Sequence, residues 1–447
     1  MSACPSRRGF DVVVLGGGIA GAGLAAQLAG ELRVALVEQE PQLGYHTTGR
    51  SAAMYIPSYG GPAVWPLTAA SRGFFEDPPR GFAGRLLSPR PVLHIARADQ
   101  ADRLDDFARR SAGVAALRRL GRDGALRRAP ILRPQAVATA LLETEAGDLD
   151  VARLHGGMVR RAREAGAVIL ADAGWPQIDR EGARWRVRTR QASLLAPILV
   201  NATGAWADET AQAAGLAPIG LTPRLRTAIL VDAPREIGFH DWPVVKDIDE
   251  RFYFRPFGGR LLITPADEAP SPPCDATPDE LDIACAMLRF HDVADHPVTR
   301  IHHRWAGLRT FASDRAPVIG WSQAAPGFFW LAGLGGFGIQ TAPAVSRLAA
   351  ALVRGRRPPQ DLSDHGVDAE IYSPARLEQS RAASVPSLAA RIDGSALVGP
   401  VGLEASLFLH IILILSEMRA LRDQQPYHRA RVGVPQRSQG KDVLAEF

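Results

Sequence analysis

The chain has 447 residues, 46% of them hydrophobic, so it is long enough to bury more than one core. Its formal charge of +5 comes from arginines scattered among acidic residues, with Lys246 and Lys441 as the only lysines. Because a nucleic-acid surface needs a contiguous basic face, we expect no nucleic-acid partner. Three cysteines are too few for a disulfide framework or a zinc site, which favours a cytoplasmic protein without a bound metal.

The N-terminal pattern predicts a βαβ unit. An apolar run at residues 11–15 ends in GGGIAG at 16–21, and a helical stretch follows to residue 29. A second apolar run at 33–37 ends at Glu38, whose carboxylate can accept hydrogen bonds from a ribose. Gly16, Gly18 and Gly21 stand where a strand turns into a helix, which lets the backbone approach a pyrophosphate closely. This segment predicts a dinucleotide site, the alternative being an ordinary glycine-rich turn.

Later segments extend this α/β pattern. Apolar strand runs recur at 167–170, 198–200 and 328–332, and a helical pattern follows at 341–353. Between them, residues 221–264 alternate and are rich in aromatic and turn residues, which is typical of an antiparallel sheet. The cofactor domain is therefore predicted to be discontinuous, with a second domain inserted.

Two further glycine-containing segments favour FAD over NAD as the cofactor. VNATGAW at 200–206 resembles the second flavin-binding strand and turn of two-domain flavoproteins. GLGGFGIQT at 333–341 opens a helix whose N–H groups and dipole could stabilise the negative charge of a reduced flavin, although alone it could be a tight turn. Since no cysteine lies near residue 309, we expect non-covalent FAD.

Five segments in colinear order resemble D-arginine dehydrogenase-like enzymes of the D-amino acid oxidase family. They are GYHTTGRSAA at 44–53, LTAASR at 67–72, LSPRP at 87–91, WAGLR at 305–309 and GIQT at 338–341. The resemblance runs from about residue 10 to 377. It implies FAD contacts at Gly16, Gly18, Ile19, Ala20, Gly21, Glu38, His46, Thr47, Thr48, Arg50, Ser51, Ala52, Ala53, Val168, Ala202, Thr203, Gly204, Trp206, Gly307, Arg309, Gly335, Gly336, Phe337, Gly338, Ile339, Gln340 and Thr341.

The resemblance also implies the fold and its division. We expect a Rossmann-type FAD-binding domain made of residues 1–85, 147–220 and 304–378. An antiparallel-sheet substrate domain is expected at 86–146 and 221–303.

By the same resemblance, Arg226, Tyr253 and Arg309 hold the substrate carboxylate and Tyr59 closes over the substrate. Arginine suits this role because its rigid fork grips a carboxylate through two hydrogen bonds. The alternative for each arginine is a surface ion pair, and for Tyr59 a packed loop aromatic.

Three positions depart from the arginine-specific pattern. Val92 stands where those enzymes have a glutamate that pairs with the substrate guanidinium, Met54 replaces a histidine and Ile56 a threonine. A guanidinium left unpaired beside these side chains would cost several kcal/mol. We therefore expect these three residues to form the pocket for the substrate side chain. The expected activity is oxidative deamination of apolar D-amino acids by hydride transfer from Cα to the flavin.

Two rival functions stay open: an oxidase of secondary amines or amino acids such as sarcosine, glycine or proline, and a flavin-binding protein with a decayed site. The electron acceptor, oxygen or a quinone, and the oligomeric state also stay open. The tail at 379–447 lies outside the resemblance, and its apolar stretch at 403–415 falls short of the ~20 residues of a membrane span. We expect that stretch to form a helix docked on the protein, a partner subunit or a membrane surface.

Overall fold

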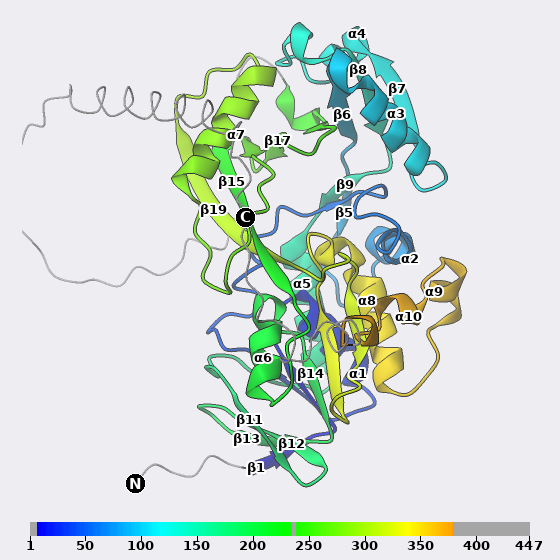
Figure 1. The fold of residues 1–447 in the computed structure, drawn as a ribbon, viewed down its shortest axis with the longest axis vertical. Helices are drawn as coiled ribbons and strands as arrows, with labels where there is room; N and C mark the ends of the chain where they lie inside the picture. The colour runs from blue at the N-terminus through cyan, green and yellow to red at the C-terminus, as the bar shows by residue number, and fades with distance from the viewer. Residues whose placement is uncertain (1–6, 235–237, 379–447) are drawn as a thin grey trace, which may run out of the picture. The chain divides into compact units, whose positions relative to one another are not determined.

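A computed structural model of the chain describes residues 7–234 and 238–378 (Figure 1). By their contacts these residues fall within one compact unit. The tail at 379–447, including the helix predicted for 403–415, lies outside the described residues. In the part of the chain that is described, no helix is both long enough and apolar enough to cross a bilayer.

A six-stranded sheet carries the glycine-rich segments of the sequence. Its neighbours are parallel except for the last two strands. In spatial order the strands are β10 (Val168–Leu170), β3 (Val34–Val37), β2 (Val12–Leu15), β14 (Ile198–Asn201), β21 (Phe328–Ala332) and β20 (Val318–Trp321).

Both faces of this sheet are covered, which is why its strands are continuous apolar runs. Val12 and Val14 of β2 belong to the core formed with helices α1 (Ile19–Leu28) and α8 (Gly338–Val353). The alternate residues Val13 and Leu15 belong to a core on the opposite face. That core includes a second sheet with the order β1 (Arg7–Gly9), β13 (Ser193–Ala196), β12 (Arg184–Arg188) and β11 (Gln177–Glu181).

An eight-stranded, mainly antiparallel sheet forms the other major part of the unit. Its order is β19 (Ile301–Phe311), β15 (Thr222–Val231), β18 (Arg260–Thr264), β17 (Tyr253–Phe257), β16 (Val244–Asp247), β6 (Val92–Ala96), β8 (Thr139–Glu143) and β7 (Leu117–Gly121). Its core includes Ile229 and Phe254 of the strands and Phe290 of α7 (Glu280–Val293).

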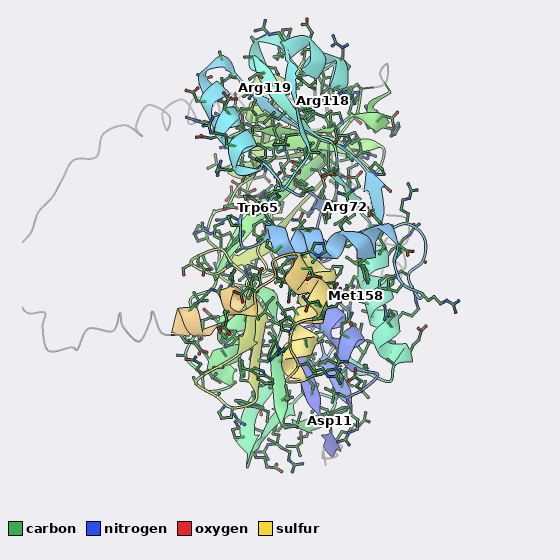
Figure 2. The ribbon with its side chains drawn as sticks, turned by 90° about the vertical axis from the view of Figure 1, so that its right-hand side faces the viewer. Asp11, Trp65, Arg72, Arg118, Arg119 and Met158 are labelled. Atoms are coloured by element: carbon green, nitrogen blue, oxygen red, sulfur yellow. The ribbon has the colours of Figure 1, made fainter. Side chains whose placement is uncertain are left out.

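Helix α2 (Trp65–Glu76) runs across the middle of the view in Figure 2, marked by Trp65 and Arg72. Arg118 and Arg119 on β7 lie above it, and Met158 of α5 (Val151–Glu164) lies below. A small sheet links strands β4 (Met54–Tyr55), β9 (Gly147–Leu149) and β5 (Leu87–Pro89). The remaining helices are α3 (Ala101–Arg110), α4 (Arg122–Arg128), α6 (Ala207–Ala213), α9 (Gln360–Asp364) and α10 (Ala369–Tyr372).

The predicted fold class, a Rossmann-type α/β domain with an antiparallel-sheet insertion, is confirmed. Two expected boundaries need correction. The boundary at residues 303/304 falls inside β19, because that strand pairs with β15 from Ile301 to Phe311 without a break in the chain. The helix predicted at 341–353 begins earlier, at Gly338.

Candidate active site

A cavity of about 760 Å³ opens between the glycine-rich edge of the six-stranded sheet and the strands β15, β16, β17 and β19. This volume lies within the range of ~300–1,000 Å³ found for ligand pockets. Most predicted site residues line it. They are Gly16, Gly18, Ile19, Ala20, Glu38, His46, Thr47, Thr48, Arg50, Ser51, Ala52, Ala53, Met54, Ile56, Tyr59, Ala202, Thr203, Gly204, Trp206, Arg226, Tyr253, Gly307, Arg309, Gly335, Gly336, Gly338, Ile339 and Gln340.

The first glycine turn has no room for a side chain at Gly16 or Gly21. Gly16 has a φ of +102°, and a Cβ there would lie 2.3 Å from the carbonyl oxygen of Ala202. A Cβ on Gly21 would lie 2.0 Å from the carbonyl oxygen of Gly16. Gly21 therefore packs the helix against the strand and does not line the cavity. The turn leaves the start of α1 facing the cavity, where backbone N–H groups can bind phosphate oxygens.

Glu38 and a residue absent from the sequence prediction, His155 of α5, hold the same turn. The Glu38 carboxylate accepts hydrogen bonds from the N–H groups of Gly17 at 2.7 Å and Glu40 at 3.0 Å. Burial raises the pKa of Glu38 despite these bonds. The Nε2 of His155 lies 2.8 Å from the carbonyl oxygen of Gly17, and burial lowers the pKa of this ring. A neutral His155 therefore donates to the turn while Glu38 accepts from it.

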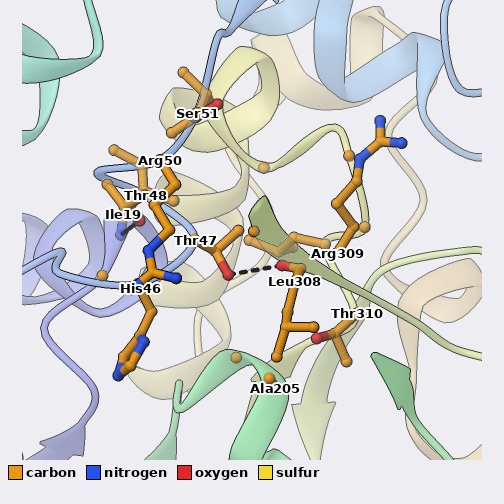
Figure 3. Close-up of a pocket in the computed structure, with 18 of the residues that line it drawn as sticks. Ile19, His46, Thr47, Thr48, Arg50, Ser51, Ala205, Leu308, Arg309 and Thr310 are labelled. Carbon is orange, nitrogen blue, oxygen red and sulfur yellow. Dashed lines mark hydrogen bonds between the residues drawn. The ribbon is translucent and has the colours of Figure 1, made fainter. Parts of the chain in front are cut away.

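The loop 44–53 joins both parts of the site (Figure 3). Thr47 donates from Oγ1 to the carbonyl oxygen of Leu308 at 2.7 Å, and the Thr48 hydroxyl accepts from the N–H of Ile19 at 3.0 Å. The Arg50 guanidinium pairs with Asp275 and donates to the carbonyl oxygens of Ala276 and Ala306. These contacts fix the loop between α1 and β19.

His46 gives an independent indication of a ligand. Its ring lies 4.5 Å from that of Trp206, and its Nε2 lies 3.1 Å from a Glu40 carboxylate oxygen. Its Nδ1 is buried and has no hydrogen-bond partner among the described residues. Since buried polar atoms are normally bonded, this atom fits a bound polar molecule. Together with the open glycine turn, it fits the FAD that the sequence predicts.

The last glycine segment lies against the arginine at the far end of the cavity. A Cβ on Gly336 would lie 1.9 Å from Nη2 of Arg309, and one on Gly335 would lie 2.3 Å from the ring of Phe311. The absence of side chains here therefore gives the Arg309 guanidinium its room. Figure 3 shows this guanidinium extending away from His46 and Arg50.

Strand register explains why two distant arginines meet. Arg226 of β15 pairs with Gly307 of β19, and Arg309 lies two residues further along β19, hence on the same face. Arg309 donates from Nη2 to the hydroxyl of Tyr59. Nη1 of Arg309 and Nη2 of Arg226 lie 3.4 and 3.2 Å from the same oxygen of Glu268. The structure thus brings together the predicted carboxylate-binding arginines.

Tyr59 is packed and surrounded by cations. Its ring lies 5.0 Å from that of Phe337, and the Lys246 ammonium lies 4.8 Å from its ring centroid. Burial alone would raise the pKa of Tyr59, but Arg309, Arg226 and Lys246 together lower it. The Tyr59 hydroxyl therefore accepts a hydrogen bond from the charged Arg309, and the side chain is fixed rather than free in its loop.

Tyr59 is held from behind by a buried carboxylate. Glu143 of β8 accepts from the N–H of Ser58 at 3.0 Å and from its hydroxyl at 2.7 Å. The Nε2 of His94 lies 3.0 Å from the same Glu143 oxygen that accepts from the Ser58 hydroxyl, and Glu143 and His94 are 0% and 2% exposed. Because Ser58 precedes Tyr59, this cluster positions the loop over the cavity.

The prediction for Val92 is wrong. Val92 is fully buried and does not line the cavity, because β6 packs it behind Met54, Ile56 and Tyr253. The cavity wall that includes Met54 and Ile56 also contains Lys246, which pairs with Glu250 at 2.5 Å. This wall is therefore partly charged, not wholly apolar.

Three more predicted cofactor residues lie outside the cavity lining. Val168 is paired within the edge strand β10, and the side chain of Phe337 packs with Val64 and Phe311. The Thr341 hydroxyl donates to the carbonyl oxygen of Phe337 inside α8. Among the described residues, no cluster of histidine, cysteine and acidic side chains could hold a metal ion.

The sequence did not single out four charged residues that line the cavity together with Arg226 and Arg309: Lys246, Glu250, Glu268 and Arg315. The rarity of lysine in this chain could have singled out Lys246. The other three lie in loops, where no periodicity marks their direction.

Comparisons with known proteins agree with this arrangement. Residues 11–352 match the family described as DAO, FAD dependent oxidoreductase. Glycine oxidase of Geobacillus kaustophilus is 23% identical over 381 residues, which cover 81% of this chain and 97% of that protein. Mitochondrial dimethylglycine dehydrogenase of Mus musculus is 25% identical over 258 residues, which are 52% of this chain and only 29% of that enzyme.

Solved structures show the same fold. The crystal structure of the Geobacillus kaustophilus glycine oxidase matches with a TM-score of 0.70 at 22% identity, covering 83% of this chain and 99% of that one. The L-alpha-glycerophosphate oxidase of Mycoplasma pneumoniae with FAD bound matches with a TM-score of 0.71 at 17% identity, covering 79% and 98%. With its glycine turns, orphaned His46 nitrogen and family match, the chain is an FAD-dependent oxidoreductase that belongs to the DAO family.

Proposed function

We propose that this enzyme oxidises the Cα–N bond of an amino acid whose carboxylate binds between Arg226 and Arg309. The observation that carries the proposal is this pair of guanidinium groups on one face of β15 and β19, at the end of the cavity beyond the glycine turns. Their side chains are only 17% and 13% exposed. Partly desolvated guanidinium groups bind a carboxylate more strongly than exposed ones do.

The residues around the arginines orient the substrate. Tyr59 and Tyr253 border the same space, so their hydroxyls can complete the contacts to the carboxylate. FAD, when bound, accepts the hydride that leaves Cα. The amine nitrogen then forms an imine with Cα, and water hydrolyses it to a 2-oxo acid and ammonia. Met54 offers no base, so the substrate amine must lose its extra proton before Cα–H cleavage.

We further propose apolar D-amino acids as the substrates. The D configuration rests on the sequence resemblance, and the apolar preference rests on Met54 and Ile56 in the cavity wall. Glu250 of the cavity lining could pair with a cationic side chain, but Lys246 already neutralises it. A substrate guanidinium would have to displace that lysine, which disfavours D-arginine.

A second candidate is the oxidation of glycine or an N-methylated glycine. It is favoured by the match along almost the whole length of a glycine oxidase and by the partial match to a dimethylglycine dehydrogenase. The same pair of arginines would hold these carboxylates. What differs is the use of Met54 and Ile56, which would then contact little of the substrate.

The test measures reduction of the bound flavin under anaerobic conditions. The holoenzyme is mixed with one compound at a time, and the loss of flavin absorbance is recorded. The panel contains D-leucine, D-methionine and D-phenylalanine, their L enantiomers, D-arginine, glycine and sarcosine. Faster reduction of the flavin by the apolar D enantiomers than by the other compounds supports the proposal. A preference for glycine or sarcosine transfers it to the second candidate. No reduction by any member would support a flavin-binding protein with a decayed site.

A further inference from the structure

Among the described residues that line the cavity, Glu268 is the acidic side chain that contacts the arginine pair. Its Oε1 lies 3.2 Å from Nη2 of Arg226, 3.4 Å from Nη1 of Arg309 and 3.1 Å from Nη2 of Arg315. Its Oε2 lies 3.0 Å from Arg315. One carboxylate oxygen is thus shared by three guanidinium groups, while the other contacts Arg315.

Like charges explain why a carboxylate belongs there in the ligand-free protein. Burial and the neighbouring Arg309 both lower the pKa of Arg226, which means that its charge is held at a cost. Two buried guanidinium groups side by side are stable only when a negative partner compensates them. Asp267 contributes to this compensation on the Arg226 side, where its carboxylate lies 3.9 Å from Nε. Glu268 is the partner that contacts both guanidinium groups.

We infer that Glu268 is an internal substitute for the substrate carboxylate, which the substrate must displace from Arg226 and Arg309. This inference rests on the proposed function, because it takes the arginine pair as the carboxylate site. Occupation by Glu268 keeps the empty site neutralised and lowers the apparent affinity for the substrate. A substrate carboxylate must therefore bind Arg226 and Arg309 strongly enough to displace Glu268.

The loop that carries Glu268 is built so that this side chain can leave while the backbone stays. The preceding residue is fixed, since the Asp267 carboxylate accepts from the N–H of Thr227 at 2.7 Å and its carbonyl oxygen accepts from Arg226 at 2.9 Å. The carbonyl oxygen of Glu268 accepts from Arg224 at 2.9 Å. The Glu268 side chain itself is 30% exposed, and the described residues that hydrogen-bond its carboxylate all do so through guanidinium groups.

Arg315 gives the displaced carboxylate a place to stay. It contacts both oxygens of Glu268, whereas Arg226 and Arg309, the clamp arginines, contact only Oε1. Its side chain is 48% exposed, against 13% for Arg309, so it stands on the solvent side of Glu268. A small rotation toward Arg315 therefore frees the clamp without leaving Glu268 unpaired.

The experiment measures binding of benzoate to the holoenzyme, with the flavin absorbance change as the readout and isothermal titration calorimetry as the second method. Benzoate carries the carboxylate but no amine, so it is not oxidised. Benzamide, which has the same shape without the charge, is the ligand control. Glu268→Gln removes the competing charge while it keeps the size of the side chain. Glu76→Gln, in an exposed ion pair with Arg72, is the matched protein control.

We expect the Kd for benzoate to fall about tenfold or more in Glu268→Gln, with no change for benzamide or in Glu76→Gln. Arg315→Gln should weaken benzoate binding, because Glu268 then has only the clamp arginines as partners. In the double variant this weakening should disappear, which shows that Arg315 acts through Glu268. An unchanged or higher Kd in Glu268→Gln would overturn the inference. So would an Arg315→Gln effect of equal size in both backgrounds.

The two proposals can fail separately. If amino acids reduce the flavin but Glu268→Gln leaves benzoate affinity unchanged, the inference fails and the proposed function stands. If benzoate binds more tightly in Glu268→Gln but no amine or amino acid reduces the flavin, the carboxylate site stands and the proposed oxidation fails.

Discussion

Replacing Arg309 by methionine removes the guanidinium fork while it keeps a long, unbranched side chain. Arg309 holds Tyr59 through Nη2 and lies 3.4 Å from Glu268 through Nη1, in a side chain that is 13% exposed. Loss of one partner from a shielded, charge-paired site costs about 3–5 kcal/mol. Because each 1.4 kcal/mol is a factor of ten, kcat/KM should fall roughly 100- to 4,000-fold. Arg226 remains to bind the carboxylate, so the lower part of that range is expected.

The assay compares steady-state kcat/KM and the FAD content of the purified variants. Arg309→Met should keep its FAD, since the glycine turns and the 44–53 loop hold the cofactor end independently. Arg309→Lys keeps the charge but loses the guanidinium fork, so its kcat/KM should lie between the values for the wild type and Arg309→Met. Arg347→Met is the control, because Arg347 forms a surface ion pair with Asp361 at 2.6 Å outside the cavity lining. If Arg309→Met retains FAD and loses less than tenfold in kcat/KM, the carboxylate does not bind where we place it.

Four further predictions follow. FAD should appear in the supernatant after acid precipitation, because no cysteine lies near Arg309 to attach it; flavin that stays in the pellet would contradict this. Gly336→Ala should retain FAD but lose activity, since its Cβ would lie 1.9 Å from the Arg309 guanidinium; wild-type kcat/KM would contradict the geometry. With Met54 in place of a base, kcat/KM should rise with pH as the substrate amine titrates, and a plateau already at about pH 6 would reveal a missed base. Burial lowers the pKa of His94 below 6.5, so the unfolded chain binds a proton that the fold resists, and Tm should fall as pH falls below about 6.5. His94→Gln should flatten that slope between pH 7 and 5, and an unchanged slope would exclude His94 as its source.

The cofactor end was predictable because its constraints are local. The apolar runs at residues 11–15 and 33–37 are strands buried on both faces. A Cβ on Gly16 or Gly21 would clash with backbone atoms. Such steric demands leave a direct trace in the sequence, since only glycine meets them. That Arg226 and Arg309 lie together was predicted only from the family resemblance, because the register that brings β15 against β19 has no local signal in the sequence.

The sequence did not reveal toward which side of the fold certain side chains point. All five residues of β6 are buried, so no alternation marks which face Val92 presents, and it lies behind the wall rather than in it. The charged groups Glu268 and Arg315 lie in loops, whose contacts depend on the path of the chain between strands. Lys246 lies in the cavity wall because it pairs with Tyr253 across β16 and β17. The sequence alone does not predict this strand register.

The most direct test of the account is single-turnover reduction of the flavin under anaerobic conditions with the best substrate of the panel, unlabelled and carrying deuterium at Cα. Cleavage of the Cα–H bond with the carboxylate held by Arg226 and Arg309 predicts slower reduction by the deuterated substrate. It also predicts one 2-oxo acid formed for each flavin reduced. Reduction that yields no 2-oxo acid, or a flavin that stays oxidised with every carboxylate-bearing amine tested, would contradict it.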